Sequence, residues 1–305
     1  MTALALATRR SPLAMVQAEE VSAALRERRP GLEVELVAMS TRGDETLDRA
    51  LAPIGGKGLF IKALEVALEA GRARIAVHSL KDLPAVLERG FSLAAVPARH
   101  DPRDVLISPH GPDIGSLPRG ARVGTASLRR QAQLLAARPD LEVVTLRGSV
   151  QTRLARLDAG ELDATVLAAA GLARLGIERG TPLAPEVMLP ASGQGALGLE
   201  VLADDPEAAE LARGLEDPDA RLAATAERAF CRELGATCAS PVAAYATIAG
   251  GRVRLTVRVA AADGSRVLED AGEAAPDGAM TLGGRLARNL LERGAGDLIA
   301  PPATD

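Results

Sequence analysis

The chain has 305 residues, of which 47% are hydrophobic and 25% charged, and its formal net charge is −4. This length suffices for two or three globular domains, and this composition excludes a disordered chain. The negative charge, together with one Tyr, three Phe and no Trp, argues against a nucleic-acid-binding protein.

The sequence also contains no pattern typical of a membrane protein, a secreted protein or a metal-binding protein. No apolar run is long enough to cross a bilayer, and the start MTALALATRR does not have the basic-then-apolar order of a secretory signal. The two cysteines, Cys231 and Cys238, cannot form a disulfide framework, and the three histidines have no metal-ligand spacing. We therefore expect a cytoplasmic protein without a metal site.

The first pattern along the chain is an internal repeat. Residues 11–37 read as a helix capped by Ser11, then a turn at Pro30 and Gly31, then a strand. Residues 127–146 give the same order, with Ser127 as the cap and a turn at Pro139 and Asp140. Residues 67–80 and 156–169 each read as a helix, a glycine turn and a buried strand. Helices that alternate with apolar strands, twice over, predict two similar α/β lobes that bind a ligand at the carboxyl ends of their strands.

From about residue 217 the pattern changes to that of a small α+β domain. The expected elements are a helix at 219–234, strands at 242–249, 252–260 and 265–270, and a helix near 280–293. The pairs Gly250-Gly251 and Asp263-Gly264 predict hairpin turns between these strands. The predicted domains are a first lobe at 1–98 with 196–215, a second lobe at 102–192 and a C-terminal domain at 217–305. Candidate hinges are residues 98–104 and 189–198.

Two glycine-rich stretches have to be weighed as nucleotide-binding motifs. GQGALG at 193–198 matches a dinucleotide fingerprint, but strand-like residues follow it where that motif needs a helix, which favours a hinge. GGKG at 55–58 lacks the glycine spacing of a P-loop and is better interpreted as a mobile loop that ends at Phe60.

Several arginines stand at predicted helix starts: Arg9, Arg10, Arg129, Arg130, Arg147 and Arg153. A helix N-terminus is partly positive, so a cation there costs about 0.3 to 1 kcal/mol unless an anion lies nearby. The repeated placement indicates a ligand rich in carboxylate or phosphate groups. The alternative is solvated arginine in a chain that has only three lysines.

The stretch IAVHSLKDLP, residues 75–84, places Lys81 and Asp82 at the end of a buried strand. Partial desolvation would raise the pKa of Asp82 and Lys81 would lower it, a combination that suits a general acid or base or a group that stabilises a cation. An exposed ion pair is the plainer alternative. We interpret His78 as a core histidine bonded to the backbone, Cys231 as a small core residue in a helix, and Cys238 as a loop thiol suited to be a nucleophile or an attachment point.

Taken together, the sequence resembles the porphobilinogen deaminase family, whose members are also called hydroxymethylbilane synthases. The resemblance is carried by ATRRSPLAMVQA, STRGDETLD, GGKGLFIKALEVAL, IAVHSLKDLP, HDPRDVLIS, VGTASLRRQAQL, LRGSVQTRLARLDAGELDATVLAAAGLARLG, LPASGQGALGLE and GATCASP. Because these stretches follow in order over almost the whole chain, they are far more specific than any one short motif.

The resemblance implies an α/β fold with two lobes similar to periplasmic binding proteins, built on parallel or mixed sheets, plus a small C-terminal α+β domain. It implies an enzyme that attaches a dipyrromethane cofactor to Cys238 through a thioether and uses it as a primer. Four porphobilinogen molecules are then joined head to tail with loss of ammonia, and hydrolysis releases hydroxymethylbilane for haem biosynthesis. The family leads us to expect a monomer with a small-molecule substrate and no nucleic-acid or membrane partner.

The resemblance also assigns roles to individual positions. It implies that Asp82 is the catalytic carboxylate, which assists ammonia loss and stabilises the resulting cation. The positions expected to hold the cofactor are Cys238, Lys81, Thr125, Ser127, Arg129, Arg130 and Arg147. The positions expected to hold the substrate are Arg9, Ser11, Phe60, Arg153 and Arg174.

Two positions depart from the family pattern. Ala236 and Thr237 stand where two glycines usually precede the cofactor cysteine, and β-branched Thr237 would tolerate a positive φ poorly. Ser149 stands where Asn usually follows the Arg-Gly pair. The alternatives are a two-lobed binding or sensor protein, which would give Asp82 and Cys238 no task, and an inactive relative that keeps the fold.

Overall fold

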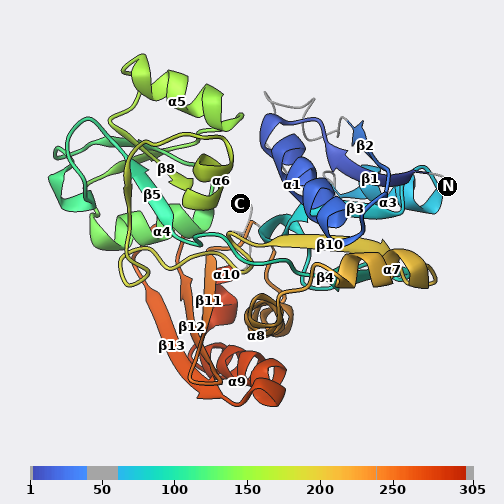
Figure 1. The fold of residues 1–305 in the computed structure, drawn as a ribbon. Coiled ribbons are helices and arrows are strands. Elements are labelled where there is room, and N and C mark those ends of the chain that lie inside the picture. The colour runs from blue at the N-terminus through green and yellow to red at the C-terminus, as the bar shows by residue number, and fades with distance from the viewer. Residues whose placement is uncertain (1–2, 40–60, 238, 300–305) are drawn as a thin grey trace. The chain divides into compact units, whose positions relative to one another are not determined.

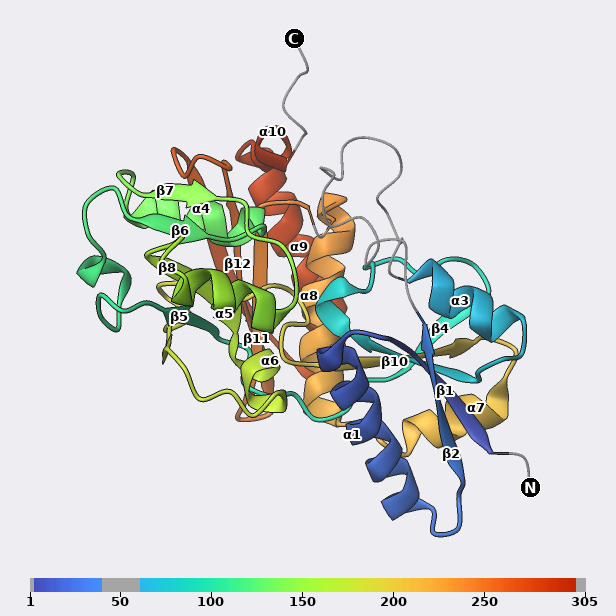
Figure 2. The same ribbon diagram turned by 90° about the horizontal axis from the view of Figure 1, so that it is seen from above.

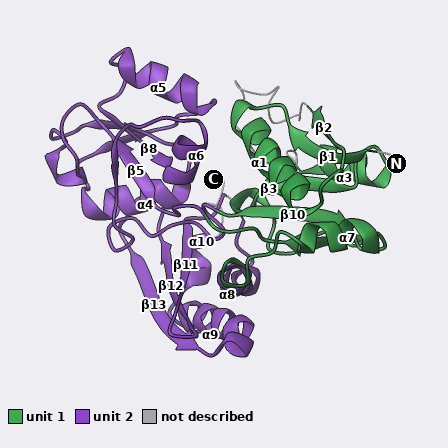
Figure 3. Ribbon diagram, in the orientation of Figure 1, with its two compact units in different colours: residues 1–99, 196–221 green, residues 100–195, 222–305 purple. Residues whose placement is uncertain are grey.

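A computed structural model describes residues 3–39, 61–237 and 239–299 of the protein. The chain divides into two compact units, which Figure 3 shows in green and purple. Unit 1 comprises residues 1–99 and 196–221, and unit 2 comprises residues 100–195 and 222–305. Within the described residues, unit 1 contains one sheet and unit 2 contains two, and the hydrophobic clusters of each unit form around its own sheets.

The elements are labelled in Figure 1. The strands are β1 Leu4–Arg9, β2 Val34–Met39, β3 Ile75–Ser79, β4 Phe91–Ala95, β5 Asp104–Ile107, β6 Arg122–Gly124, β7 Glu142–Val144, β8 Ala164–Ala168, β9 Thr181–Pro182, β10 Leu197–Leu202, β11 Val242–Ala249, β12 Arg252–Ala260 and β13 Val267–Ala274. The α-helices are α1 Pro12–Arg28, α3 Lys62–Glu69, α4 Leu128–Ala137, α5 Val150–Asp158, α6 Ala169–Arg174, α7 Pro206–Arg213, α8 Pro218–Leu234, α9 Ala279–Glu292 and α10 Ala295–Ile299. Short 3-10 turns lie at Leu80–Asp82, Ile114–Ser116 and Pro276–Gly278.

Unit 1 is a mixed sheet with the strand order β2-β1-β3-β10-β4, in which β1 runs parallel to β2 and β3 while β10 is antiparallel to both of its neighbours. Successive side chains of a strand point to opposite faces, so Leu6 and Ala7 of β1 enter different cores. Helices α1 and α7 cover the Leu6 face, and α3 covers the Ala7 face (Figure 2). Strand β10 returns the chain to this sheet after the residues of unit 2.

Unit 2 contains a second sheet with the order β7-β6-β8-β5-β9. Strand β6 runs parallel to β7 and β8, and β5 is antiparallel to both of its neighbours. Leu134 of α4 packs on one face, and Leu154 of α5 with Leu172 of α6 packs on the other. The two sheets therefore share one topology, which confirms the predicted α/β fold with two similar lobes.

The internal repeat extends to the helix caps. The Ser11 hydroxyl accepts a hydrogen bond from the Ala14 amide at 3.4 Å, and the Ser127 hydroxyl accepts one from the Arg130 amide at 3.5 Å. Ser149 caps α5 in the same way, at 3.1 Å from the Thr152 amide. Such caps each contribute about 1 kcal/mol, and Ser149 keeps this role at a position where the family usually has Asn.

The C-terminal part of unit 2 is the antiparallel sheet β11-β12-β13, with α8 and α9 on one face. Gly250 and Gly251 have φ values of 56° and 70°, which confirms the predicted hairpin turn. The strand predicted at 265–270 is present, but it starts two residues later and runs over Val267–Ala274. The reason is the turn before it, where the Asp263 carboxylate accepts hydrogen bonds from both the amide and the hydroxyl of Ser265.

Within the described residues, none of the helices has the length and apolar character needed to span a membrane.

Candidate functional site

The candidate site residues of unit 1 gather at one edge of its sheet. Arg9 is the last residue of β1, Ser11 caps α1, and Lys81 with Asp82 lies in the 3-10 turn directly after β3. Because β1 and β3 are parallel neighbours, their carboxyl ends meet at the same edge. The structure therefore brings these four positions to one side of unit 1, as the sequence pattern predicts.

The end of β3 is held from two directions. The Gln17 amide nitrogen on α1 donates a hydrogen bond to the Ser79 hydroxyl at 2.8 Å, and the Leu80 amide donates to the Ala196 carbonyl at 3.0 Å. Lys81 is half-buried, whereas Asp82 is exposed. The expectation of a partly desolvated Asp82 is thus wrong for this structure, because the turn that follows the buried strand already lies at the surface.

A buried acid–imidazole pair lies below this edge. His78 Nε2 lies 2.9 Å from Glu200 Oε2, and both side chains are buried. The interpretation that His78 bonds to the backbone is wrong, since its partner is the carboxylate of β10. Glu65 of α3 is buried as well, and burial, followed by the charges of Glu200 and Glu88, raises the pKa of the Glu65 carboxyl.

Unit 2 gathers the remaining described candidates in the same manner. Strands β6, β7 and β8 are parallel, and the candidates Thr125, Ser127, Arg129, Arg130, Arg147, Arg153 and Arg174 all follow their carboxyl ends or lie in the next helix. The Thr125 hydroxyl accepts a hydrogen bond from the Ser127 amide at 3.1 Å. Arg153 Nε donates to the Gly148 carbonyl at 3.0 Å.

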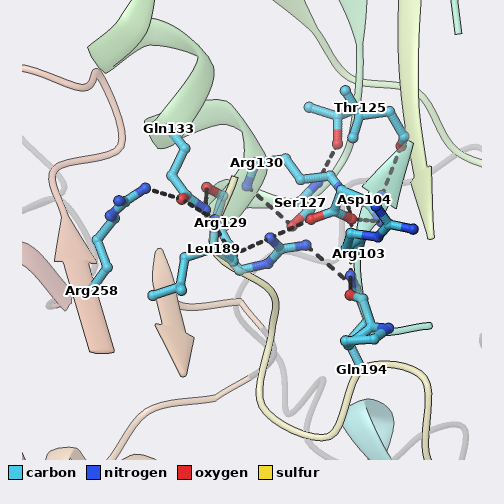
Figure 4. A network of polar contacts seen from close by, with 12 residues as sticks. Arg103, Asp104, Thr125, Ser127, Arg129, Arg130, Gln133, Leu189, Gln194 and Arg258 are labelled. Carbon is cyan, nitrogen blue, oxygen red and sulfur yellow. Dashed lines mark hydrogen bonds and ion pairs between the residues drawn. The ribbon is translucent and has the colours of Figure 1, made fainter. Parts of the chain in front are cut away.

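Arg129 and Arg130, in the first turn of α4, share the carboxylate of Asp104 (Figure 4). Arg129 Nη1 lies 2.6 Å from Asp104 Oδ2, and Arg130 contacts Oδ1 through Nε at 3.0 Å and Nη2 at 2.7 Å. All three side chains are buried. Burial opposes ionisation of Asp104, but the charges of Arg129 and Arg130 outweigh it and hold the pKa of the Asp104 carboxyl well below its usual range.

This cluster contradicts the alternative of solvated arginine for Arg129 and Arg130. It also adds residues that the sequence analysis missed. The Gln194 amide nitrogen donates to Asp104 Oδ1 at 3.1 Å and to the Pro102 carbonyl at 2.7 Å. The available signal was the stretch DVLI, in which an aspartate opens an otherwise apolar strand.

Of the two cysteines, the structure describes Cys231, and it confirms the prediction of a core residue in a helix. Cys231 lies in α8 against the core of the C-terminal sheet, where burial raises the pKa of its thiol to about 11, so it is a structural residue. Cys238 and Phe60 lie outside the described residues. Every described residue with a positive φ is a glycine. Thr237 therefore has a negative φ, and its β-branched side chain does not strain the backbone.

No group of three or more His, Cys, Asp or Glu side chains in the described part of the chain is arranged to hold a metal ion.

Comparison with known proteins supports the assignment made from these motifs. The family profile described as "Porphobilinogen deaminase, dipyromethane cofactor binding domain" matches residues 4–210, and the profile "Porphobilinogen deaminase, C-terminal domain" matches residues 221–292. A porphobilinogen deaminase from Chromobacterium violaceum is 50% identical over 98% of this chain and 98% of its own. One from Xanthomonas campestris pv. campestris is 52% identical over 98% of this chain and 99% of its own.

A solved structure with a similar fold is the extracellular-binding protein ytmK of a probable amino-acid ABC transporter from Bacillus subtilis, with a TM-score of 0.44, 14% identity, and coverage of 70% of this chain and 90% of that one. The family profiles and the half-identical relatives cover nearly the whole sequence and include both the buried arginine cluster and the domain that contains Cys238. The chain belongs to the porphobilinogen deaminase family.

Proposed function

We propose that this protein is a hydroxymethylbilane synthase. It joins four porphobilinogen molecules head to tail, releases four molecules of ammonia, and hydrolyses the linear product hydroxymethylbilane from a dipyrromethane primer for haem biosynthesis. The observation that carries the proposal is the buried Arg129–Asp104–Arg130 cluster in a chain of this family.

The cluster fits a ligand that carries carboxylates. Two buried guanidiniums against one buried carboxylate leave one positive charge in excess, and an uncompensated buried charge costs several kcal/mol. A carboxylate of the dipyrromethane would balance it. The residues that would hold this group are Thr125, Ser127, Arg129, Arg130 and Arg147, with Cys238 as the covalent anchor, and the family pattern adds Lys81. When bound, the dipyrromethane supplies the pyrrole α-carbon from which the chain grows.

The chain's own groups then act on porphobilinogen. Asp82, directly after β3, accepts a hydrogen bond from the pyrrole N–H of the substrate. Its negative charge stabilises the positive charge that develops on the pyrrole as ammonia leaves. The substrate side chains are acetate and propionate, whose carboxylates would be bound by Arg9, Ser11, Arg153 and Arg174. The family pattern adds Phe60 as a further substrate-binding position. The exposed position of Asp82 supports this role, since an incoming substrate can reach its carboxylate.

Intact-mass analysis of the purified wild-type protein tests the proposal. We expect a covalent addition that corresponds to one dipyrromethane, absent from Cys238→Ser and retained in Cys231→Ala, because Cys231 is a core residue. An unmodified wild-type chain would contradict the proposed enzyme and favour a binding protein that performs no chemistry.

We further propose that the enzyme works as a cytoplasmic monomer. The chain's two cysteines, Cys231 and Cys238, suit a reducing compartment, and each unit buries hydrophobic clusters of its own. Sedimentation equilibrium over a range of protein concentrations should give the mass of one chain, and a mass that rises with concentration would refute the monomer.

A further inference from the structure

We propose that Gln133 and Arg258 are positioning residues that couple the C-terminal domain to Arg129. Through them, the domain that contains Cys238 fixes the guanidinium that would hold a dipyrromethane carboxylate. The inference rests on the proposed function, and it concerns residues that lie outside the catalytic and binding positions named above.

Gln133 of α4 is buried, and its amide is fully used (Figure 4). Its nitrogen donates to the carbonyls of Leu189 at 3.1 Å and Arg129 at 3.2 Å. Its oxygen accepts from the Leu189 amide at 2.8 Å and from Arg258 Nη1. An amide has two N–H donors and two acceptor lone pairs, so all four are satisfied and the side chain has one orientation only.

The Leu189 carbonyl links this amide to the arginine cluster. It accepts from Arg129 Nη1 at 2.7 Å as well as from Gln133, and the same Nη1 reaches Asp104. Arg129 Nη2 lies 3.4 Å from the Gln194 amide oxygen. The guanidinium is therefore held between a carboxylate, a carbonyl and an amide, and Gln133 fixes the carbonyl among them.

Arg258 brings β12 of the C-terminal domain into this network. Its Nη2 donates to the Glu186 carbonyl at 3.2 Å and to the Glu269 carboxylate at 3.1 Å, and its side chain is only 12% exposed. Its Nε is buried and has no hydrogen-bond acceptor among the described residues. A buried N–H without an acceptor lowers the stability of the folded protein. Arg258 is therefore a poor choice if its task is only to stabilise the domain contact, which favours a positioning role.

The same helix makes a second contact with the C-terminal domain that does not involve Arg129. Gln131 donates from its amide nitrogen to the Ala262 carbonyl at 3.1 Å. Close by, a Cβ on Gly264 would lie only 2.3 Å from the Ala136 nitrogen, so the hairpin between β12 and β13 packs directly against α4. Gln131 thus offers a matched control, because it joins the same helix to the same domain through a glutamine side chain.

The test compares Gln133→Met, Arg258→Met and Gln131→Met in the full chain. The fraction of protein that carries the covalent addition is measured by intact mass, and the thermal unfolding midpoint of each variant is measured in parallel. We expect Gln133→Met and Arg258→Met to reduce the loaded fraction about fivefold, while Gln131→Met loads as the wild type does. Arg258→Lys, which keeps the positive charge and one donor nitrogen at the end of the side chain, should recover part of the loss.

A double-variant cycle separates positioning from general destabilisation. If Gln133 acts through Arg129, adding Gln133→Met to Arg129→Lys should cause no further loss of loading, whereas an independent effect would multiply. Multiplying losses, or a Gln133→Met protein that loads as the wild type does, would overturn the inference. Equal losses in Gln133→Met and Gln131→Met that track their unfolding midpoints would also overturn it. An unmodified wild-type chain would overturn the proposed function and this inference together.

Discussion

Asp82 and Asp104 show how two aspartates of one chain take different tasks from different surroundings. Asp82 follows a strand and is exposed, so a ligand at the sheet edge can reach its carboxylate. Asp104 opens a strand, is fully buried and is shared by two guanidiniums. The exposed carboxylate of Asp82 is suited to act on a ligand. The buried carboxylate of Asp104 is suited to fix the positions of the two arginine side chains.

Replacement of Asp82 should separate activity from stability. We expect Asp82→Asn to slow ammonia release from porphobilinogen by about 10² to 10⁴-fold, because the neutral amide no longer stabilises the developing cation. The urea midpoint should stay unchanged, since Asp82 is exposed. Asp204→Asn, at another exposed carboxylate of unit 1, is the control. A normal rate for Asp82→Asn would refute its role.

Replacement of Asp104 should have the opposite outcome for stability. Asp104→Asn leaves two buried guanidiniums without a counter-charge, and we expect it to lower the free energy of unfolding by about 3 to 5 kcal/mol. Asp101→Asn, in the same segment, removes an ion pair to Arg103 whose side chains are 36% and 43% exposed, so about 1 kcal/mol or less is expected. Equal losses in urea titrations would argue that the buried cluster contributes no more than a surface pair.

At the scale of elements, the chain passes from unit 2 to unit 1 after Gly195, within the hinge predicted at 189–198, and hydrogen bonds hold the residues before that point. The Pro190 carbonyl accepts from the Ala244 amide, the Gly193 amide donates to the Glu227 carboxylate at 2.6 Å, and the Gly195 carbonyl accepts from the His100 amide at 3.2 Å. Position 195 needs a glycine because the backbone of residue 100 passes very close to it. A Cβ on Gly195, which has φ +88°, would lie 2.4 Å from the His100 carbonyl oxygen.

Gly195→Ala should therefore destabilise the protein for two reasons, the positive φ of this residue and the clash of the new Cβ with the His100 carbonyl oxygen. We expect a loss of about 3 kcal/mol in the free energy of unfolding, from left-handed strain and from separation of the two crossover segments. Gly176→Ala is the comparison, since Gly176 has φ +66° with nothing within 4 Å of a Cβ, and about 1 kcal/mol is expected. A smaller loss at Gly195 than at Gly176, by chemical denaturation, would disprove the steric argument.

Local elements were predictable from the sequence, and distant polar partners were not. Serine caps, glycine turns and the repeated helix–strand order depend on neighbouring residues, so Ser11, Ser127 and Gly250 were predicted correctly. Gln133 and Arg258 are 125 residues apart, and no periodic pattern reports such a contact. The same limit explains why the carboxylate partner of His78 was missed, since Glu200 enters the sheet from a strand 122 residues later.

At the scale of the whole molecule, stability should depend on pH through carboxyls with opposite pKa shifts. Asp104 has a lowered pKa, so its stabilising contribution is present above the ordinary value of 3.8 and is lost as the pH falls. Glu65 has a raised pKa, so its contribution is present below the ordinary value of 4.5 and is lost as the pH rises through the folded-state value. Stability should therefore fall at the acidic end and also be limited at neutral pH.

Glu65→Gln tests the second effect. We expect the variant to gain stability relative to the wild type as the pH rises from 4.5, because the buried acid no longer has to ionise, and to match it below that value. Glu69→Gln, on the exposed side of the same helix, should give a difference that does not vary with pH. The measurement is the free energy of unfolding in urea at a series of pH values, and a flat difference for Glu65→Gln would contradict the prediction.

The strand order of the first sheet also constrains how the chain can be made. Among the described strands, β4 pairs with β10 alone, and β10 begins at Leu197, after every strand of the second sheet has been synthesised. A nascent chain that has just left the ribosome with β1 to β4 thus has an open edge on β3 and an unpaired β4. Unpaired strand edges of this kind invite aggregation, so this protein should depend on ribosome-bound chaperones until β10 emerges.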